Sequence, residues 1–163
     1  MRLDPIDLKI LAALQADGRI TKLRLAELVS LSPSACFERL RRLEQAGYVK
    51  SYHAVIDLAR IVRTTTALVE ITLARHEASD FARFEGAVAA APEVMECHSI
   101  GGGIDYVLKV VAVDIDHYQA IMDRLLAADV GIARYFTYFV TKVVKRQLAY
   151  PIHTLLQAGD GAP

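Results

Sequence analysis

The sequence predicts an α+β protein with an N-terminal winged helix-turn-helix followed by a ferredoxin-like domain of order βαββαβ. Three short amphipathic helical patterns with capping residues fill residues 3–47, and strand patterns alternate with helical ones from residue 66 onward. The charge is also segregated. Residues 1–60 carry 10 Lys and Arg against 7 Asp and Glu, and the rest carry 9 against 12, although the 163-residue chain is neutral overall. Its 53% hydrophobic content is enough to bury a core.

The first helix is predicted to start at Asp4, a good N-cap, with Pro5 as its first helical residue. Leu3 and Leu8 have the spacing of a hydrophobic staple, and Gly18 can end the helix. Its buried face is expected to consist of Ile6, Ile10, Leu11 and Leu14.

A second helix, residues 21–29, is predicted to be capped by Thr21, and a third, residues 32–44, by Ser32 with Pro33 at its first position. Only Ser30 and Leu31 separate the second helix from the cap of the third. Two amphipathic helices joined by so short a turn are typical of a helix-turn-helix.

The third helix has one apolar and one arginine-rich face. Its apolar positions, which we expect to be buried, are Cys36, Leu40, Leu43 and Gly47. Its opposite face consists of Ser34, Ala35, Glu38, Arg41, Arg42 and Gln45, with Phe37 and Arg39 between the faces. Such a face is often only solvated, with ion pairs at helical spacing. The preceding helix and short turn favour DNA recognition instead, and the small residues at the start allow close approach to base edges.

Residues 48–57 alternate and are rich in β-branched and aromatic types, which predicts a strand or a small hairpin wing. Lys50 in this segment either contacts phosphate or is a solvated edge lysine. The predicted organisation is a winged helix-turn-helix domain over residues 1–57, a linker over 58–65, a ferredoxin-like domain over 66–150 and a C-terminal tail over 151–163 that frays.

The second domain is predicted from four strand patterns and two helical ones. Ser79 is expected to cap the first of these helices and Pro92 to stop it, and Asp114 or Asp116 is expected to begin the second. The predicted elements, in order, are strand 66–73, helix 79–91, strand 94–100, strand 104–113, a helix with Tyr118, Ile121, Leu125 and Met122 facing the sheet, and strand 132–144.

Gly101, Gly102 and Gly103 join two strands rather than a strand and a helix, so the dinucleotide-binding interpretation fails. Two interpretations stay open. The glycines form a hairpin turn that needs positive φ, or their missing side chains leave room for a small ligand beside Asp105, whose carboxylate can hold an ammonium group. Hydroxyls from the last strand are candidates for the same pocket, though they are also ordinary strand residues: Thr137, Tyr138 and Thr141.

Several functional classes are not supported. Cys36 and Cys97 do not suggest a disulfide, and the five histidines show no metal-ligand spacing, so we expect neither a metal nor another cofactor. No nucleophile and base accompany Asp105, which argues against an enzyme. No signal-peptide pattern opens the chain, and charges interrupt the apolar run 104–113, so we expect a cytoplasmic protein without membrane contact.

The chain resembles the Lrp/AsnC family, the feast/famine regulators, over nearly its full length. The similar segments are Leu3-Asp4-x-Ile6-Asp7, Asp17-Gly18-Arg19-Ile20, Leu31-Ser32-Pro33 with Cys36-x-Glu38-Arg39-x-Arg41-Arg42-Leu43-Glu44, and Asp105-Tyr106-Val107-Leu108-Lys109. The resemblance implies a DNA-binding domain, a second domain that binds amino acids and dimerises through its sheet, and assembly of dimers into larger homo-oligomers. It places the effector near residues 101–106. Residues 129–138 resemble a subgroup associated with catabolism of ectoine-like compounds.

Two positions depart from the family. Ser30 stands where glycine is common in the turn, so either the turn is strained or it does not need positive φ. Gly103 stands where a second acid often precedes Asp105 and Tyr106.

We therefore predict a transcriptional regulator that binds a pseudo-palindromic operator in double-stranded DNA as a dimer and responds to an amino acid or a related metabolite; the alternative is an architectural DNA-binding protein without an effector. The predicted groove-facing residues are Ser32, Ser34, Ala35, Glu38, Arg41 and Arg42, and Lys22 and Arg39 are predicted to contact phosphates. The predicted effector residues are Gly101, Gly102, Gly103, Asp105, Tyr106, Thr137, Tyr138 and Thr141.

Overall fold

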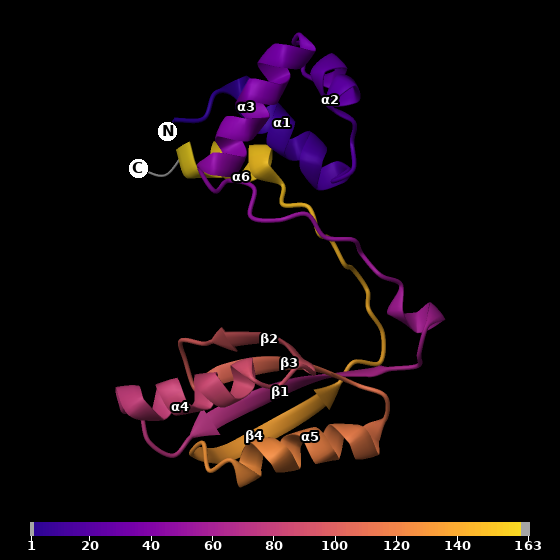
Figure 1. Cartoon of the computed structure of the whole chain (residues 1–163). Helices are drawn as coiled ribbons and strands as arrows, with labels where there is room; N and C mark the ends of the chain where they lie inside the picture. The colour runs from indigo at the N-terminus through magenta and orange to yellow at the C-terminus, as the bar shows by residue number, and fades with distance from the viewer. Residues whose placement is uncertain (1, 161–163) are drawn as a thin grey trace. The chain divides into compact units, whose positions relative to one another are not determined.

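The computed structural model describes residues 2–160, which form two compact units (Figure 1). The helical unit combines the residues up to Val55 with the segment that begins at Lys145, and the sheet unit spans Ile56–Val144. The chain therefore leaves the helical unit, builds the sheet unit and returns, so that segments from both ends of the chain belong to one unit.

The helical unit contains α1 (Pro5–Ala16), α2 (Lys22–Leu28), α3 (Pro33–Gln45) and α6 (Ile152–Asp160). The three predicted caps are confirmed, because the side chains of Asp4, Thr21 and Ser32 each accept a hydrogen bond from a backbone N–H in the first turn that follows. The buried core includes Ile10, Leu25, Ala26, Val29, Cys36, Leu40 and Leu43. The predicted apolar face of the third helix is confirmed at its three helical positions, and Gly47 lies just beyond the helix end and is exposed.

The turn between α2 and α3 has a backbone conformation that favours glycine, yet it contains Ser30 at φ +56°. The Leu31 N–H donates to the Ala26 carbonyl at 3.0 Å, and the Ser30 N–H donates to the Glu27 carbonyl at 3.2 Å. These two bonds define a Schellman motif, which places the residue after the C-cap in the left-handed region. The turn thus requires positive φ, and serine adopts it at a conformational cost.

The predicted strand at residues 48–57 is wrong, because no β-strand forms there and the chain continues into a 3-10 turn at Leu58–Arg60. A strand needs a partner for its backbone groups, and the described residues of the helical unit offer none. Instead, Tyr52 folds back toward the end of α3, and its hydroxyl donates to Glu44 Oε1 at 2.8 Å.

The expected fraying of the C-terminal residues is also wrong as far as they are described, because α6 forms and contacts α1. The side chain of Gln15 makes two bonds with the backbone of Tyr150. Its Oε1 accepts from the Tyr150 N–H at 2.8 Å, and its Nε2 donates to the Tyr150 carbonyl at 3.4 Å. Residues 161–163 of the predicted tail lie outside the described residues.

The sheet unit has the predicted order βαββαβ, with the four strands arranged β2-β3-β1-β4 and all neighbours antiparallel (Figure 1). Its elements are β1 (Thr65–Leu73), α4 (Ala78–Ala89), β2 (Val94–Ser99), β3 (Tyr106–Ala112), α5 (Ile115–Ala127) and β4 (Ile132–Phe139). Several predicted bounds change, most clearly at one helix cap and one strand end. Helix α4 begins after Glu77, so Ser79 is not its cap, and β4 ends at Phe139 rather than at residue 144. Asp114 caps α5.

The two faces of the sheet differ. One packs against α4 and α5 around a core that includes Val69, Ile71, Phe84, Leu108, Val110, Ile121 and Met122, all fully buried. The opposite face carries side chains that alternate with these along the strands. It is partly apolar and open, with Leu68, Phe136 and Tyr138 between 40% and 53% exposed. Such a face is available to another surface.

Candidate DNA interface and effector pocket

The outer face of α3 presents the polar residues that the sequence indicates. All six predicted groove-facing residues are exposed: Ser32, Ser34, Ala35, Glu38, Arg41 and Arg42. The Arg41 guanidinium lies 3.7 Å from Glu38, a loose ion pair between two well-exposed side chains. Because such a pair contributes little, Arg41 can exchange Glu38 for another anion.

Arg39 lies differently from the other arginines of α3, because it turns back onto the start of α1. Its Nη1 donates to Asp4 at 2.5 Å and to Asp7 at 2.9 Å, and these two bonds raise the pKa of Arg39. Asp7 is fully buried, so this contact neutralises a carboxylate inside the unit. Arg39 therefore joins α3 to α1.

The same acidic pair also involves the capping of α1. Asp4 and Asp7 form a capping box, in which each side chain accepts from the other residue's backbone N–H. The N–H of Asp7, followed by Arg39, holds the pKa of Asp4 below its ordinary value of 3.8. Arg42 reaches Asp7 more weakly, with its Nη2 3.4 Å from Oδ2. One buried carboxylate thus organises both helices.

The remaining cations near α3 have separate surroundings. The Lys22 Nζ of α2 lies 3.9 Å from the centroid of the Phe37 ring, a cation–π contact that links the two helices of the motif. Lys50 is exposed. A surface hollow of about 310 Å³ on α3 is lined by Glu38, Arg39, Arg41, Arg42 and Gln45.

In the sheet unit, the Asp105 carboxylate lies just before β3 and has two partners. Its Oδ2 accepts from the Leu73 N–H at the end of β1 at 2.7 Å, and its Oδ1 lies 2.9 Å from His76 Nε2. The backbone of Asp105 is fixed as well, because its N–H donates to Ile71 and its carbonyl accepts from Ile100. The side chain is 16% exposed, so the carboxylate remains accessible.

Tyr106 is buried, and its ring packs with those of Phe81 and Phe84. Its hydroxyl donates to Glu85 Oε1 at 2.8 Å, and its ring lies 4.6 Å from that of Phe84. Burial, followed by Glu85, raises the pKa of Tyr106 strongly. The contacts of Tyr106 within the chain are therefore structural.

The glycine loop between β2 and β3 is exposed at all three positions. Gly102 has φ +150°, and a Cβ placed on Gly101, Gly102 or Gly103 would meet no atom within 4 Å. The loop therefore has both properties that the sequence suggested, a conformation suited to glycine and open space beside it.

The hydroxyls of the last strand do not join this loop within one chain. Thr137 lies on the helical face of the sheet and bonds to the Tyr118 hydroxyl of α5. Tyr138 lies on the opposite face, where its hydroxyl donates to Glu70 at 3.4 Å. Thr141 follows the end of β4 and is exposed.

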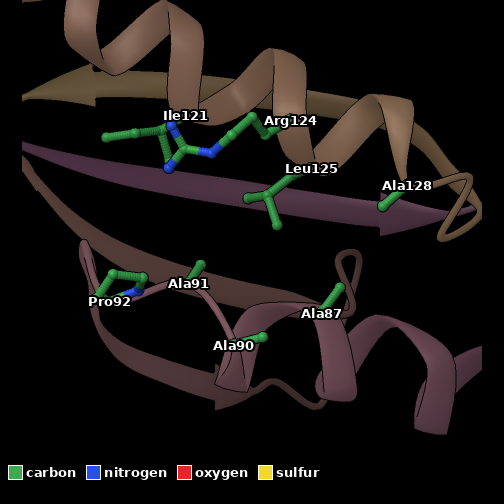
Figure 2. A pocket seen from close by; sticks show the side chains of 8 residues that line it. All are labelled: Ala87, Ala90, Ala91, Pro92, Ile121, Arg124, Leu125 and Ala128. Atoms are coloured by element: carbon green, nitrogen blue, oxygen red, sulfur yellow. The ribbon is translucent and has the colours of Figure 1, made fainter.

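A hollow of about 290 Å³ lies between α4 and α5 (Figure 2). Most of the side chains that line it are small and apolar (Figure 2). The one charged side chain among them, Arg124, donates to Glu93 at 2.7 Å. The lining residues are Ala87, Ala90, Ala91, Pro92, Ile121, Arg124, Leu125 and Ala128, none of them a predicted effector residue.

Two residues with important contacts are not predicted from the sequence. Asp7 is part of a family-like segment, but no local pattern marks it as the buried partner of two arginines. His76 lies in the loop after β1, 29 residues from the aspartate that it contacts. Only strand register could have brought these positions together.

Within residues 2–160, no cluster of three or more His, Cys, Asp or Glu side chains has the arrangement of a metal site. In the same range, no helix has the length and apolar character needed to cross a membrane.

Comparisons with known proteins agree with this architecture. Residues 66–150 match the model described as Lrp/AsnC ligand binding domain, and residues 3–50 match winged helix-turn-helix DNA-binding. The transcriptional regulatory protein DoeX of Halomonas elongata is 53% identical over 149 residues, 91% of this chain and 94% of the relative. The leucine-responsive regulatory protein of Escherichia coli is 38% identical over 152 residues, 93% of each chain.

Solved structures give the same result. A transcriptional regulator of Neisseria meningitidis, crystallised as a complex with L-Met, superposes with a TM-score of 0.87 at 32% identity, covering 94% of this chain and 99% of the other. An AsnC family transcriptional regulator of Agrobacterium tumefaciens gives 0.88 at 31% identity with the same coverage.

Proposed function

The chain belongs to the Lrp/AsnC family of DNA-binding transcriptional regulators, and we propose that it acts in the cytoplasm as a dimer that binds an operator through α3 and is modulated by an amino acid. The observation that carries the DNA part is the exposed polar face of α3, with small residues at its start and two arginines further along.

We assign base and groove contacts to the six exposed residues Ser32, Ser34, Ala35, Glu38, Arg41 and Arg42, and phosphate contact to Lys22. Arg39 receives a different role from the predicted one. Because two carboxylates hold its guanidinium, it sets the position of α3 rather than meeting phosphate.

The dimer is proposed to form through the open face of the sheet. Apolar area on this face is supplied by Leu68, Phe136 and Tyr138. The same face also carries charged groups on the neighbouring strands, among them Glu96 and Lys109, which lie 2.5 Å apart. A two-fold pair of DNA-binding units predicts half-sites about 34 Å apart, one helical turn of DNA, or a multiple of this distance. Further assembly of dimers is part of the same proposal.

The effector part of the proposal rests on Asp105. Its accessible carboxylate lies beside a loop with open space, which suits the ammonium group of an amino acid. The Neisseria relative was crystallised with L-Met, which supports this ligand class. Because Thr137, Tyr138 and Thr141 lie away from the loop within one chain, they can contribute only from a neighbouring subunit. A link to ectoine-like compounds stays a prediction.

Arg41→Ala tests the DNA interface, with Arg24→Ala as the matched control. Both arginines are exposed and pair with a glutamate three residues away, but only Arg41 lies on the proposed groove face. In a gel-shift titration at fixed salt, Arg41→Ala should weaken operator binding roughly 5- to 100-fold, the loss expected for one base contact. Equal operator affinity of the two variants would show that Arg41 does not contact the operator.

Asp105→Asn tests the effector pocket. In a thermal-shift screen over amino acids, at least one of them should raise the melting temperature of the wild-type protein. The variant should keep its DNA affinity and lose that response. If no amino acid shifts the wild-type melting temperature or assembly state, the architectural alternative, DNA binding without an effector, is favoured.

A further inference from the structure

Asp105 is not an empty ammonium site, because a histidine of the same chain already contacts it. The two partners of its carboxylate are the Leu73 N–H on Oδ2 and the His76 ring on Oδ1. These partners differ in how firmly they are held. Leu73 belongs to β1, an inner strand of the sheet, and is in register with Ile132 of β4, whereas His76 lies in the loop between β1 and α4.

The contacts of His76 show that it can be displaced. Its side chain is 56% exposed, and its other described contact is a tilted ring pair with Phe81 at 5.9 Å. A half-exposed polar contact of this kind contributes little free energy. Rotation of one side chain would therefore free Asp105 Oδ1 without disturbing the strand that positions the carboxylate.

The arginines of the same region do not compete for this oxygen. Arg75 and Arg83 both donate to Asp80 Oδ1, at 3.2 Å and 2.7 Å. Asp80 is buried, so it holds both guanidinium groups at the start of α4. His76 is therefore the cationic or hydrogen-bonding side chain that contacts Asp105 in the described part of the chain.

We propose that His76 occupies the ammonium subsite of Asp105 in the free protein and is displaced by the effector, so that it selects ligands with a free, charged amino group. The inference rests on the proposed role of Asp105 as the effector contact. An alkylammonium group brings a full charge and three donors, so it replaces the imidazole bond with a charge-assisted one. The neutral amide of an N-acylated amino acid offers one uncharged donor and cannot make that exchange.

Because the effector must displace His76, its apparent affinity is reduced in proportion to the fraction of molecules in which Asp105 Oδ1 is free of the histidine. Since a partly exposed contact of this kind is weak, His76→Ala should bind a free amino acid roughly two- to fivefold more tightly than the wild-type chain. The N-acetyl form of the same amino acid should gain no affinity from the change. A residue with a purely structural role would not alter this selectivity in that direction.

The test is calorimetric titration of the full-length chain with each of the twenty L-amino acids and the N-acetyl form of each that binds. Wild type, His76→Ala, Asp105→Asn and the control His53→Ala are compared, since His53 is an exposed histidine of the helical unit. The expected result is tighter binding of the free amino acid by His76→Ala alone and loss of binding by Asp105→Asn.

Equal or weaker binding by His76→Ala, with Asp105→Asn still inactive, would overturn the displacement proposal and leave the effector assignment standing. If neither wild type nor His76→Ala binds any amino acid while operator binding persists, the effector assignment fails and the inference fails with it.

Discussion

Ser30→Gly should stabilise the helical unit, because the turn before α3 places a serine where the backbone favours glycine. Ser30 has φ +56°. The end of α3 provides an internal comparison, since Gly47 has φ +77° and takes the same place in a second Schellman motif, where the Tyr48 N–H donates to Leu43 and the Gly47 N–H to Glu44. One motif thus has the preferred residue and the other does not.

The expected size follows from two opposing effects. A side chain in the left-handed region costs about 1–2 kcal/mol, and glycine removes this cost. Glycine also gives the unfolded chain more conformational freedom, which lowers the free energy of unfolding by about 0.5–1 kcal/mol. The Ser30 hydroxyl has no hydrogen-bond partner in the described residues, so its loss adds nothing. With the middle of each range, the net gain is about 0.8 kcal/mol, or roughly 3–6 °C in melting temperature for a unit of this size.

Differential scanning calorimetry of the full-length chain, with circular dichroism at 222 nm, measures the shift. Gly47→Ser is the matched control of opposite sign, because a Cβ at Gly47 would meet no atom within 4 Å and only the backbone conformation is affected. An unchanged or lower melting temperature for Ser30→Gly, alongside a lower one for Gly47→Ser, would refute the assignment of strain to Ser30.

Three further predictions concern charge and the C-terminal segment. Asp7→Asn weakens the bonds from Arg39 and Arg42 to a buried carboxylate. Urea unfolding should therefore show a free energy of unfolding lower by about 2 kcal/mol, and gel shifts should show weaker operator binding. If neither the free energy of unfolding nor the operator affinity changes, Asp7 does not anchor α3. The pKa values of Asp4, Glu93 and Glu96 are lowered, by the Asp7 N–H, the backbone N–H of Glu93 and Lys109 respectively. Carboxyl groups with lowered pKa values stabilise the fold at pH values above their unfolded pKa values of 3.8 and 4.5, and this stability is lost as the pH falls through the lower folded pKa values. The melting temperature should therefore drop between about pH 5 and pH 3. A constant melting temperature over this range would argue against a stabilising role for these three carboxylates. Gln15→Ala removes both bonds to Tyr150, so limited trypsin digestion after Lys145 and Arg146 should be faster than in wild type, and equal rates would show that α6 is held by other contacts.

Local signals predicted the elements well where the chemistry is local. Asp4, Thr21 and Ser32 cap helices because each side chain bonds an N–H within three residues, and such pairs can be recognised from spacing alone. The order βαββαβ followed from alternating patterns of sufficient length. The segment 48–57 failed because alternation shows that a strand is possible without showing that a partner strand exists.

The candidate site was less predictable, because its decisive contacts join distant segments. The helical wheel placed Arg39 between the two faces of α3, but its partners Asp4 and Asp7 lie 35 and 32 residues earlier. Likewise, the segment just before α6 is bonded at Tyr150 by Gln15, 135 residues away, which no local pattern reveals. Distant pairings of this kind follow only from the assembled fold.

The charged residues of α3 consequently have two separate roles. Arg41 has only a long contact within its own helix and is the arginine that we propose contacts DNA, whereas Arg39 is committed to a buried carboxylate of α1. Arg42 is shared, since it is half exposed and reaches Asp7 at 3.4 Å. A DNA-binding defect from replacing Arg42 would therefore combine lost contact with lost positioning. Only Arg41 separates the two effects, because its replacement leaves the link between the helices intact.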